Sequence, residues 1–169
     1  MGWGDDPHGS PGRVETAIDE VTGTIPCDFL VLKDRGFDPE QILVPTAGGP
    51  DSDLSAAVAT LLQEEYGSEV TLLHVADEDQ TAAREFLDEW ARDHGFEDVT
   101  FRIETGDVEQ AIEDAAEEAT LVVVGATEQG LLSRLVSDSL VLDVVYDVDS
   151  SVLLAEKHRT RSLWERLFG

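Results

Sequence analysis

Short apolar runs and longer amphipathic stretches alternate along most of this chain. Runs rich in Val, Ile and Leu predict strands at 42–44, 69–75, 99–103, 121–124 and 151–155. Apolar residues at helical spacing predict helices after Asp51 or Ser52 and at 80–93, 107–118 and 130–146. Strands that alternate with helices in this way imply an α/β fold, with a mostly parallel sheet covered by helices on both faces.

The apolar residues of each predicted helix mark the face that turns toward the sheet. Asp51 or Ser52 is expected to cap the first helix. Its inner face is predicted to hold Leu54, Val58, Leu61 and Leu62. For the helix at 80–93 the predicted inner residues are Ala83, Phe86, Leu87 and Trp90. For the helix at 107–118 they are Val108, Ala111, Ile112 and Ala115.

The start of the chain repeats its end. Shifting the sequence places Gly2-Trp3 on Gly125-Ala126 and Phe29-Leu30-Val31 on Val152-Leu153-Leu154, with no gap. An offset this close to one domain length is typical of a tandem array. We therefore divide the chain into three parts. They are the remnant of a preceding repeat with its connector at 1–37, a complete domain at 38–157, and an amphipathic tail at 158–169.

Acidic residues dominate the composition, with 37 Asp and Glu against 11 Lys and Arg and a net charge of −26. The acids are spread through helical and loop segments, which fits either a positively charged partner or adaptation to a high-salt cytoplasm. The scarcity of lysine favours high salt, where the Debye length falls to about 3 Å or less and self-repulsion is screened. No basic stripe is present to neutralise phosphates, so nucleic acid is not an expected partner.

Few residues in the sequence suggest chemistry. Cys27 is the single cysteine, which excludes an intrachain disulfide and fits a reducing interior. No apolar run approaches a membrane span and no signal peptide is visible, so we expect a soluble, cytoplasmic segment. The four histidines lack the spacing of metal ligands, so no metal site is predicted. His74 is interpreted as a strand-end residue with a structural hydrogen bond. No catalytic residue is predicted, because Ser139 has no histidine near it in sequence to activate it.

Ligands of parallel sheets bind outside the carboxyl ends of the strands, and here that edge is built by residues 45–50 and 125–130. At these two loops the sequence resembles the universal stress protein family. The matching segments are ILVPTAGGPDSDLSAAVA, VTLLHV, GDVEQAIEDAA and LVVVGATEQGLLSRLVSDSLVLDVV. The resemblance covers Gln41 to about Lys157, and the N-terminal remnant resembles the last helix and strand of a second copy.

The family resemblance implies a three-layer, doubly wound sheet of five parallel strands, of the adenine nucleotide alpha hydrolase-like type. Members commonly dimerise by antiparallel pairing of the last strand. We therefore expect the remnant strand at 28–33 to pair antiparallel with the strand at 151–155, within one chain as a pseudo-dimer or across two chains as a homodimer. An uncovered apolar edge strand would otherwise invite aggregation.

Members that bind ATP carry Gly-x2-Gly-x9-Gly-Ser/Thr after the fourth strand, where glycines and exposed N–H groups form a phosphate cradle. Here the same register reads Gly125, Glu128, Asp138 and Ser139, so two glycines are replaced by acids. Ala47 stands where the family has an aspartate that contacts the nucleotide. A carboxylate beside a phosphate costs about 1 kcal/mol or more in an aqueous cleft, which predicts a degenerate site.

The degenerate nucleotide loop is expected to comprise Pro45, Thr46, Ala47, Gly125, Ala126, Thr127, Glu128, Gly130, Asp138 and Ser139. No cofactor is therefore expected. Gly130 can supply a glycine of the phosphate-binding motif when the motif is aligned in a shifted frame. An ATP- or AMP-binding stress-response protein therefore stays the alternative. An enzyme is the least favoured class, because no base, nucleophile or metal set converges on these loops.

The run CDFLVLKDRGFDPEQILVPTAGGPDS and the ending RSLWERLF are similar to the cytosolic C-terminal region of haloarchaeal cationic amino-acid permeases. This resemblance implies a regulatory or dimerisation module whose partner is a transmembrane permease domain. The tail places Leu163, Trp164, Leu167 and Phe168 on one helical face. That face is expected either to pack on its own domain or a dimer mate, or to dock on an anionic membrane surface or a neighbouring domain.

Overall fold

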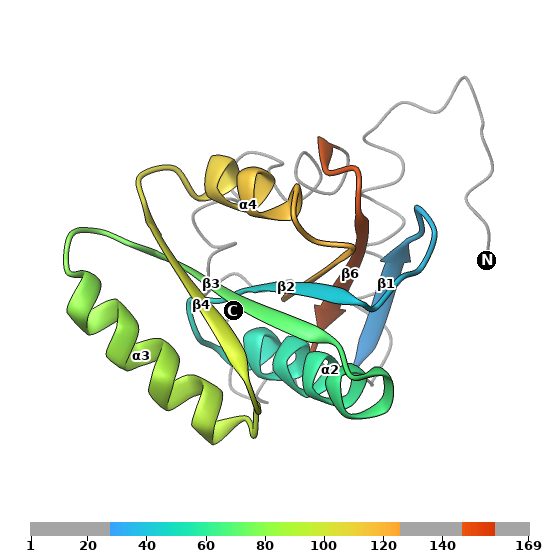
Figure 1. Cartoon of the computed structure of the whole chain (residues 1–169), viewed down its shortest axis with the longest axis horizontal. Helices are drawn as coiled ribbons and strands as arrows, with labels where there is room; N and C mark the ends of the chain where they lie inside the picture. The colour runs from blue at the N-terminus through green and yellow to red at the C-terminus, as the bar shows by residue number, and fades with distance from the viewer. Residues whose placement is uncertain (1–27, 126–146, 158–169) are drawn as a thin grey trace, which may run out of the picture. The chain divides into compact units, whose positions relative to one another are not determined.

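A computed structural model describes residues 28–125 and 147–157, and Figure 1 shows how their elements are arranged. The strands are β1 (Phe29–Lys33), β2 (Gln41–Pro45), β3 (Glu69–Ala76), β4 (Val99–Thr105), β5 (Leu121–Gly125) and β6 (Ser151–Glu156). The helices are α2 (Pro50–Tyr66), α3 (Gln80–Asp93) and α4 (Val108–Ala116). The helix predicted at 130–146, residues 1–27 of the remnant, and the tail at 158–169 lie outside the described residues.

The strands form one sheet in the order β1-β6-β5-β2-β3-β4. Strands β2 to β6 run parallel to their neighbours, and β1 pairs antiparallel with β6 at the outer edge. The predicted α/β fold is therefore confirmed, including the antiparallel strand beside the last parallel one.

The sheet separates two apolar clusters, because successive side chains of a strand point to opposite faces. Figure 1 shows α4 on one side of the sheet and α2 with α3 on the other. The cluster on the α2–α3 side includes Ile42, Val44, Ala56, Ala59, Leu72, Leu87, Trp90, Leu121 and Val123. The cluster on the α4 side includes Leu43, Leu73, Ile112, Ala115, Val122, Val124, Val148 and Val152.

Helix α2 begins differently from the prediction. Gly49 is its N-cap, Pro50 occupies the first turn, and no side chain caps it, so the prediction that Asp51 or Ser52 caps this helix is wrong. Proline lacks an N–H and has a fixed φ that suits the first helical position, which shifts the start of the helix to Pro50. Ser52 is buried inside the first turn, where its carbonyl accepts a 2.8 Å hydrogen bond from the Ser55 hydroxyl.

The inner face of α2 also differs from the prediction. Leu61 is 63% exposed, and the residues that are buried are Ser52, Ser55, Ala56 and Ala59. Small side chains allow a helix to lie close to a sheet, so the larger Leu54, Val58 and Leu62 flank the contact and are half-buried. The large apolar residues that the prediction placed on the inner face therefore lie at the borders of the buried face of α2, and Leu61 lies outside it.

Helices α3 and α4 match their predicted faces. Asp79 caps α3, and its Oδ1 accepts hydrogen bonds of 3.0 Å from the backbone N–H groups of Thr81 and Ala82. Asp107 caps α4 in the same way. The buried residues are Ala83, Leu87, Trp90 and Ala91 in α3, and Ala111, Ile112, Ala115 and Ala116 in α4. Among the described helices, none is long and apolar enough to cross a membrane.

Candidate functional site

The two loops singled out in the sequence begin next to each other. Strands β2 and β5 are parallel neighbours, with Ile42 opposite Leu121, and they end at Pro45 and Gly125. Both loops therefore leave the same carboxyl edge of the sheet, where ligands of such folds bind. Pro45, Thr46, Ala47 and Gly125 lie within the described residues. The other candidate positions, Ala126, Thr127, Glu128, Gly130, Asp138 and Ser139, lie outside them.

Thr46 is an internal anchor of the first loop. It is 1% exposed, and its backbone N–H donates a 2.9 Å hydrogen bond to the Leu73 carbonyl. Its carbonyl accepts from His74 Nδ1 at 2.9 Å, and its Oγ1 accepts from the Gly48 N–H at 3.1 Å. The His74 ring also packs against Phe86, with 4.8 Å between the ring centroids. The predicted structural hydrogen bond of His74 is thus confirmed.

Ala47 is the residue of this loop that faces solvent after the buried Thr46. Where the family resemblance implies an aspartate, this position offers a methyl group, which forms no hydrogen bond to a nucleotide. The exposed position at Ala47 therefore carries neither a charged nor a hydrogen-bonding side chain.

Two glycines turn the chain from β2 into α2. Gly48 and Gly49 have φ values of +85° and +98°, which L side chains rarely adopt. Gly49 also has a ψ of 168°, a combination that is essentially restricted to glycine. A Cβ on Gly48 would lie 3.7 Å from the Phe86 ring, an ordinary contact, so backbone conformation sets the preference for glycine there.

We expect Gly49→Asn to lower the free energy of unfolding by about 1–3 kcal/mol, because asparagine does not relieve the strain at this φ and ψ. The matched control is Gly67→Asn. Gly67 ends α2 with φ 69° and ψ 32°, a left-handed conformation that asparagine tolerates. Urea denaturation followed by circular dichroism measures both variants. Equal losses at the two positions would show that backbone conformation at Gly49 is not limiting.

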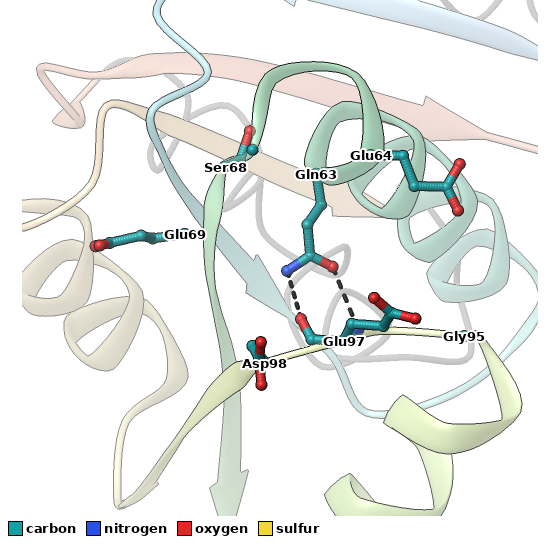
Figure 2. A pocket seen from close by; sticks show the side chains of 8 residues that line it. Gln63, Glu64, Ser68, Glu69, Gly95, Glu97 and Asp98 are labelled. Carbon is teal, nitrogen blue, oxygen red and sulfur yellow. Dashed lines mark hydrogen bonds between the residues drawn. The ribbon is translucent and has the colours of Figure 1, made fainter.

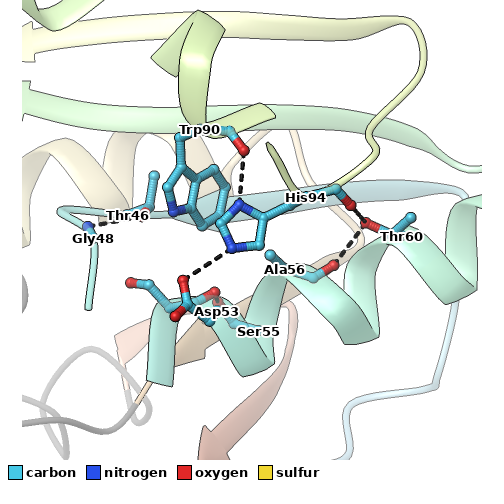
Figure 3. A network of polar contacts seen from close by, with 9 residues as sticks. Thr46, Gly48, Asp53, Ser55, Ala56, Thr60, Trp90 and His94 are labelled. Atoms are coloured by element: carbon cyan, nitrogen blue, oxygen red, sulfur yellow. Dashed lines mark hydrogen bonds and ion pairs between the residues drawn. The ribbon is translucent and has the colours of Figure 1, made fainter. Parts of the chain in front are cut away.

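A second polar network joins α2 to α3 (Figure 3). His94, the C-cap of α3, places its Nε2 2.9 Å from Asp53 Oδ1 in the first turns of α2. Its Nδ1 lies 2.7 Å from the Trp90 carbonyl, and its ring lies against the Trp90 indole with 4.4 Å between centroids. Sequence reasoning missed this network because Asp53 and His94 are far apart in the chain.

The hollow in Figure 2 lies away from the candidate loops, near the amino ends of β3 and β4. It measures about 370 Å³ and is lined by Gln63, Glu64, Gly67, Ser68, Glu69, Gly95, Glu97 and Asp98. The Gln63 side chain spans it through hydrogen bonds to the backbone carbonyl and N–H of Glu97, at 2.7 and 3.4 Å. Four carboxylates around the hollow disfavour an anionic ligand such as a nucleotide.

Three carboxylates gather beside α4. Oxygen atoms of Glu109, Glu113 and Asp147 lie within 4.8 Å of one another, and this is the set of potential metal ligands that the described ranges contain. Calcium takes six to eight oxygen ligands, so three carboxylates form an incomplete shell. Glu113 is half-buried, whereas the neighbouring Asp114 is exposed.

Comparison with known proteins links part of the chain to a family. Residues 80–156 match the model of the universal stress protein family. This match covers less than half of the chain, and it supports the family resemblance noted in the sequence. No curated protein matches the chain.

Solved structures show the same fold over a larger share of the chain. A universal stress protein from Archaeoglobus fulgidus is 24% identical with a TM-score of 0.57, over 70% of this chain and 44% of that protein. A universal stress protein in complex with cAMP is 20% identical with a TM-score of 0.54, over 68% and 94% of the two chains. A Pseudomonas aeruginosa protein of unknown function is 19% identical with a TM-score of 0.59, over 98% and 64%. This chain thus spans less than half of the Archaeoglobus protein.

Proposed function

We propose that this chain is a non-catalytic regulatory and pairing module of the universal stress protein type. Its sheet continues through β1 into a second domain of the same fold, and its nucleotide loop has lost tight binding. The observation that carries the proposal is the antiparallel pairing of β1 with β6.

The register of this pairing fits a two-fold relation between two copies of the fold. Val31 lies opposite Leu154, and the sequence repeat makes the same two residues equivalent. The repeat also makes Leu30 equivalent to Leu153, and Leu32 equivalent to Ala155. In the ladder these partners are exchanged, because Leu30 lies opposite Ala155 and Leu32 lies opposite Leu153. In an isologous interface each such contact occurs twice with the roles exchanged. A pseudo-two-fold axis through Val31 and Leu154 therefore accounts for the register.

The outer strand β1 also has an apolar face that is more exposed to solvent than the same face of β6. Leu30 and Leu32 are 48% and 36% exposed, whereas Leu153 is half-buried and Ala155 is fully buried. Residues opposite each other in a ladder share a face of the sheet, and on β6 this face lies on the side of α2 and α3. The two-fold relation then places a helix equivalent to α2 over Leu30 and Leu32, and a strand equivalent to β5 beside β1.

Two features support the loss of tight nucleotide binding. Ala47 supplies no carboxylate to a nucleotide, and the sequence replaces two cradle glycines with Glu128 and Asp138. The alternative is an ATP- or AMP-binding stress-response protein, which is favoured by the cAMP complex of a protein with the same fold. That protein was solved in complex with cAMP, and it is 20% identical to this chain.

We further propose that the parent of this module is a haloarchaeal amino-acid permease, with the module on the cytosolic side in concentrated salt. This part of the proposal is supported by the resemblance of the segments 27–52 and 162–168 and by the net charge of −26. Removing the module from such a permease is expected to change the rate or regulation of transport. Unchanged transport would contradict a regulatory role.

A cysteine cross-link tests the pairing directly. In a Cys27→Ser background, Val31→Cys with Leu154→Cys places two thiols on opposed residues of one sheet face. The control, Leu32→Cys with Leu154→Cys, places them on opposite faces. We expect the first pair to form a disulfide under mild oxidation and the control pair to remain reduced.

Light scattering of the cross-linked protein then separates the two forms of the proposal. A monomer mass indicates a pseudo-dimer within one chain, and a dimer mass indicates a homodimer through the same strands. If the Val31 and Leu154 pair oxidises no faster than the control pair, the proposed pairing is wrong.

A further inference from the structure

We propose that β6 selects a strand of the β1 type over a second β6, and that Lys33 and the turn after it make this selection. The partner in the pairing is then the domain that ends in β1, a preceding repeat, and not an identical copy of the domain that ends in β6. This inference rests on the proposed pairing function, and it names the partner that the pairing takes.

Lys33 fastens the end of β1 to the segment that leads into β6, and Figure 1 shows the two strands side by side. The Lys33 Nζ donates a 2.7 Å hydrogen bond to the Val148 carbonyl. Burial and the nearby Arg35 lower the pKa of Lys33. Asp149 and Asp147 act in the opposite direction and raise this pKa. The segment before β6 therefore offers the neighbouring strand a carbonyl acceptor and negative charge, both of which suit an ammonium group.

The sequence repeat puts the opposite charge at the same place in β6. The shift that places Phe29 on Val152 also places Lys33 on Glu156. Two β6 strands paired in the β1–β6 register would thus bring a carboxylate to the position of Lys33. A carboxylate has no proton to give to a carbonyl, and it repels nearby acidic groups. In an isologous pair this unfavourable contact would occur twice.

The turn after β1 is also fastened to β6. The Arg35 N–H donates a 2.9 Å hydrogen bond to Ser151 Oγ, and the Ser151 hydroxyl donates to the Gly36 carbonyl at 3.4 Å. Ser151 is the first residue of β6 and is 1% exposed. Within the turn, the Gly36 N–H donates a 2.8 Å hydrogen bond to Asp34 Oδ1, and Gly36 has a φ of +96°. The path of the chain after β1 therefore depends on an aspartate and a glycine at these two positions.

The sequence that follows β6 does not encode this turn. The repeat places Asp34 on Lys157 and Gly36 on Arg159. A lysine side chain has no acceptor for a backbone N–H, and residues other than glycine rarely adopt a φ near +96°. A second β6 would therefore form neither the contact made by Lys33 nor the turn that meets Ser151.

Amide hydrogen exchange of residues 29–33 in the full chain tests the role of Lys33. Lys33→Met keeps a long side chain and removes its N–H donors, so we expect these amides to exchange roughly tenfold faster or more. The control is Arg35→Met, which removes one positive charge from an exposed side chain nearby and should leave the exchange unchanged. Equal exchange in wild type and Lys33→Met would overturn this inference alone. Unprotected amides in wild type would show that β1 is not paired, and the pairing function would fail with it.

A second comparison tests the turn through two glycines with the same backbone. Gly36 and Gly106 have φ values of +96° and +97°, and a Cβ on either meets no atom within 4 Å. Gly106 follows β4 at the opposite edge of the sheet. We expect Gly36→Ala to speed exchange in β1 roughly fivefold or more, while Gly106→Ala leaves it unchanged. Equal effects of the two variants on β1 would contradict the role of the turn.

A single cysteine tests whether β6 accepts a second β6. In a Cys27→Ser background, Leu154→Cys would place two thiols opposite each other in a β6–β6 pair, because the repeat makes Val31 and Leu154 equivalent. Lys33→Glu in the same background weakens the competing β1. We expect no disulfide-linked dimer with or without Lys33→Glu, under conditions that oxidise the Val31 and Leu154 cysteine pair. A disulfide-linked dimer in either protein would overturn the proposed selection.

Discussion

Trp90→Ala is expected to lower the free energy of unfolding by about 3–5 kcal/mol. Trp90 is 7% exposed and belongs to the cluster between the sheet and helices α2 and α3. Its indole stacks on Phe96 with 5.9 Å between ring centroids, and it also contacts the His94 ring. Alanine would leave a cavity at this junction and remove the surface on which His94 rests.

Trp90→Phe separates ring volume from hydrogen bonding at the same position. Within the described part of the chain, the buried Nε1 of Trp90 has no hydrogen-bond partner. Phenylalanine keeps most of the apolar ring and removes this unpaired N–H, so its cost should be much smaller, about 1 kcal/mol. Urea denaturation followed by circular dichroism compares the two variants. A loss for Trp90→Phe as large as for Trp90→Ala would show that the indole N–H has an essential partner.

Restoring the family residues of the nucleotide loop is expected to create ATP binding. The variant combines Ala47→Asp, Glu128→Gly and Asp138→Gly in one chain. In the proposed degenerate site, each glycine removes a carboxylate that would repel phosphate by about 1 kcal/mol or more, and it would also allow the backbone to approach the ligand. Together these changes should increase the affinity for ATP by roughly 100-fold or more, which corresponds to about 2.7 kcal/mol or more.

The control for this variant is Glu64→Gln, which changes the net charge by the same amount. Glu64 is exposed near the C-terminal end of α2, at the acidic hollow and away from the loops. Isothermal calorimetry with ATP in concentrated KCl measures both proteins. If the triple variant binds ATP no better than Glu64→Gln, the three replacements do not explain weak binding, and the proposal of a degenerate site fails.

Local sequence signals predicted most of the fold. Helix α3 runs from Gln80 to Asp93 as expected, because Asp79 provides a cap and the apolar residues follow a clear helical period. Strand β5 was evident as a continuous apolar run, which is typical of a central parallel strand. The sequence repeat and the family resemblance together predicted the antiparallel position of β1, which the β1–β6 ladder confirms.

Helix α2 shows where local signals were insufficient. Its buried face is made of Ser55, Ala56 and Ala59, and small residues give little hydrophobic periodicity. The start of the helix depends on Gly49 and Pro50, whose backbone preferences outweigh the capping tendency of Asp51 and Ser52.

The sequence predicted at which edge of the sheet the candidate site lies, but it did not predict how the residues around the site pack. Pro45 and Gly125 end neighbouring parallel strands at one edge, as strand order alone requires. The burial of Thr46 and the contact between Asp53 and His94 depend on how α2 and α3 pack, and no spacing in the sequence encodes that. The roles of Glu128, Gly130, Asp138 and Ser139 stay predictions, because these residues lie outside the described ranges.

Calorimetric titration of the wild-type chain with ATP and AMP, in multimolar KCl and after circular dichroism has confirmed folding, tests the central claim most directly. A pairing module with a degenerate loop should give no heat of binding for either nucleotide. Micromolar affinity for ATP or AMP would contradict the account, and it would make nucleotide sensing the function of this domain.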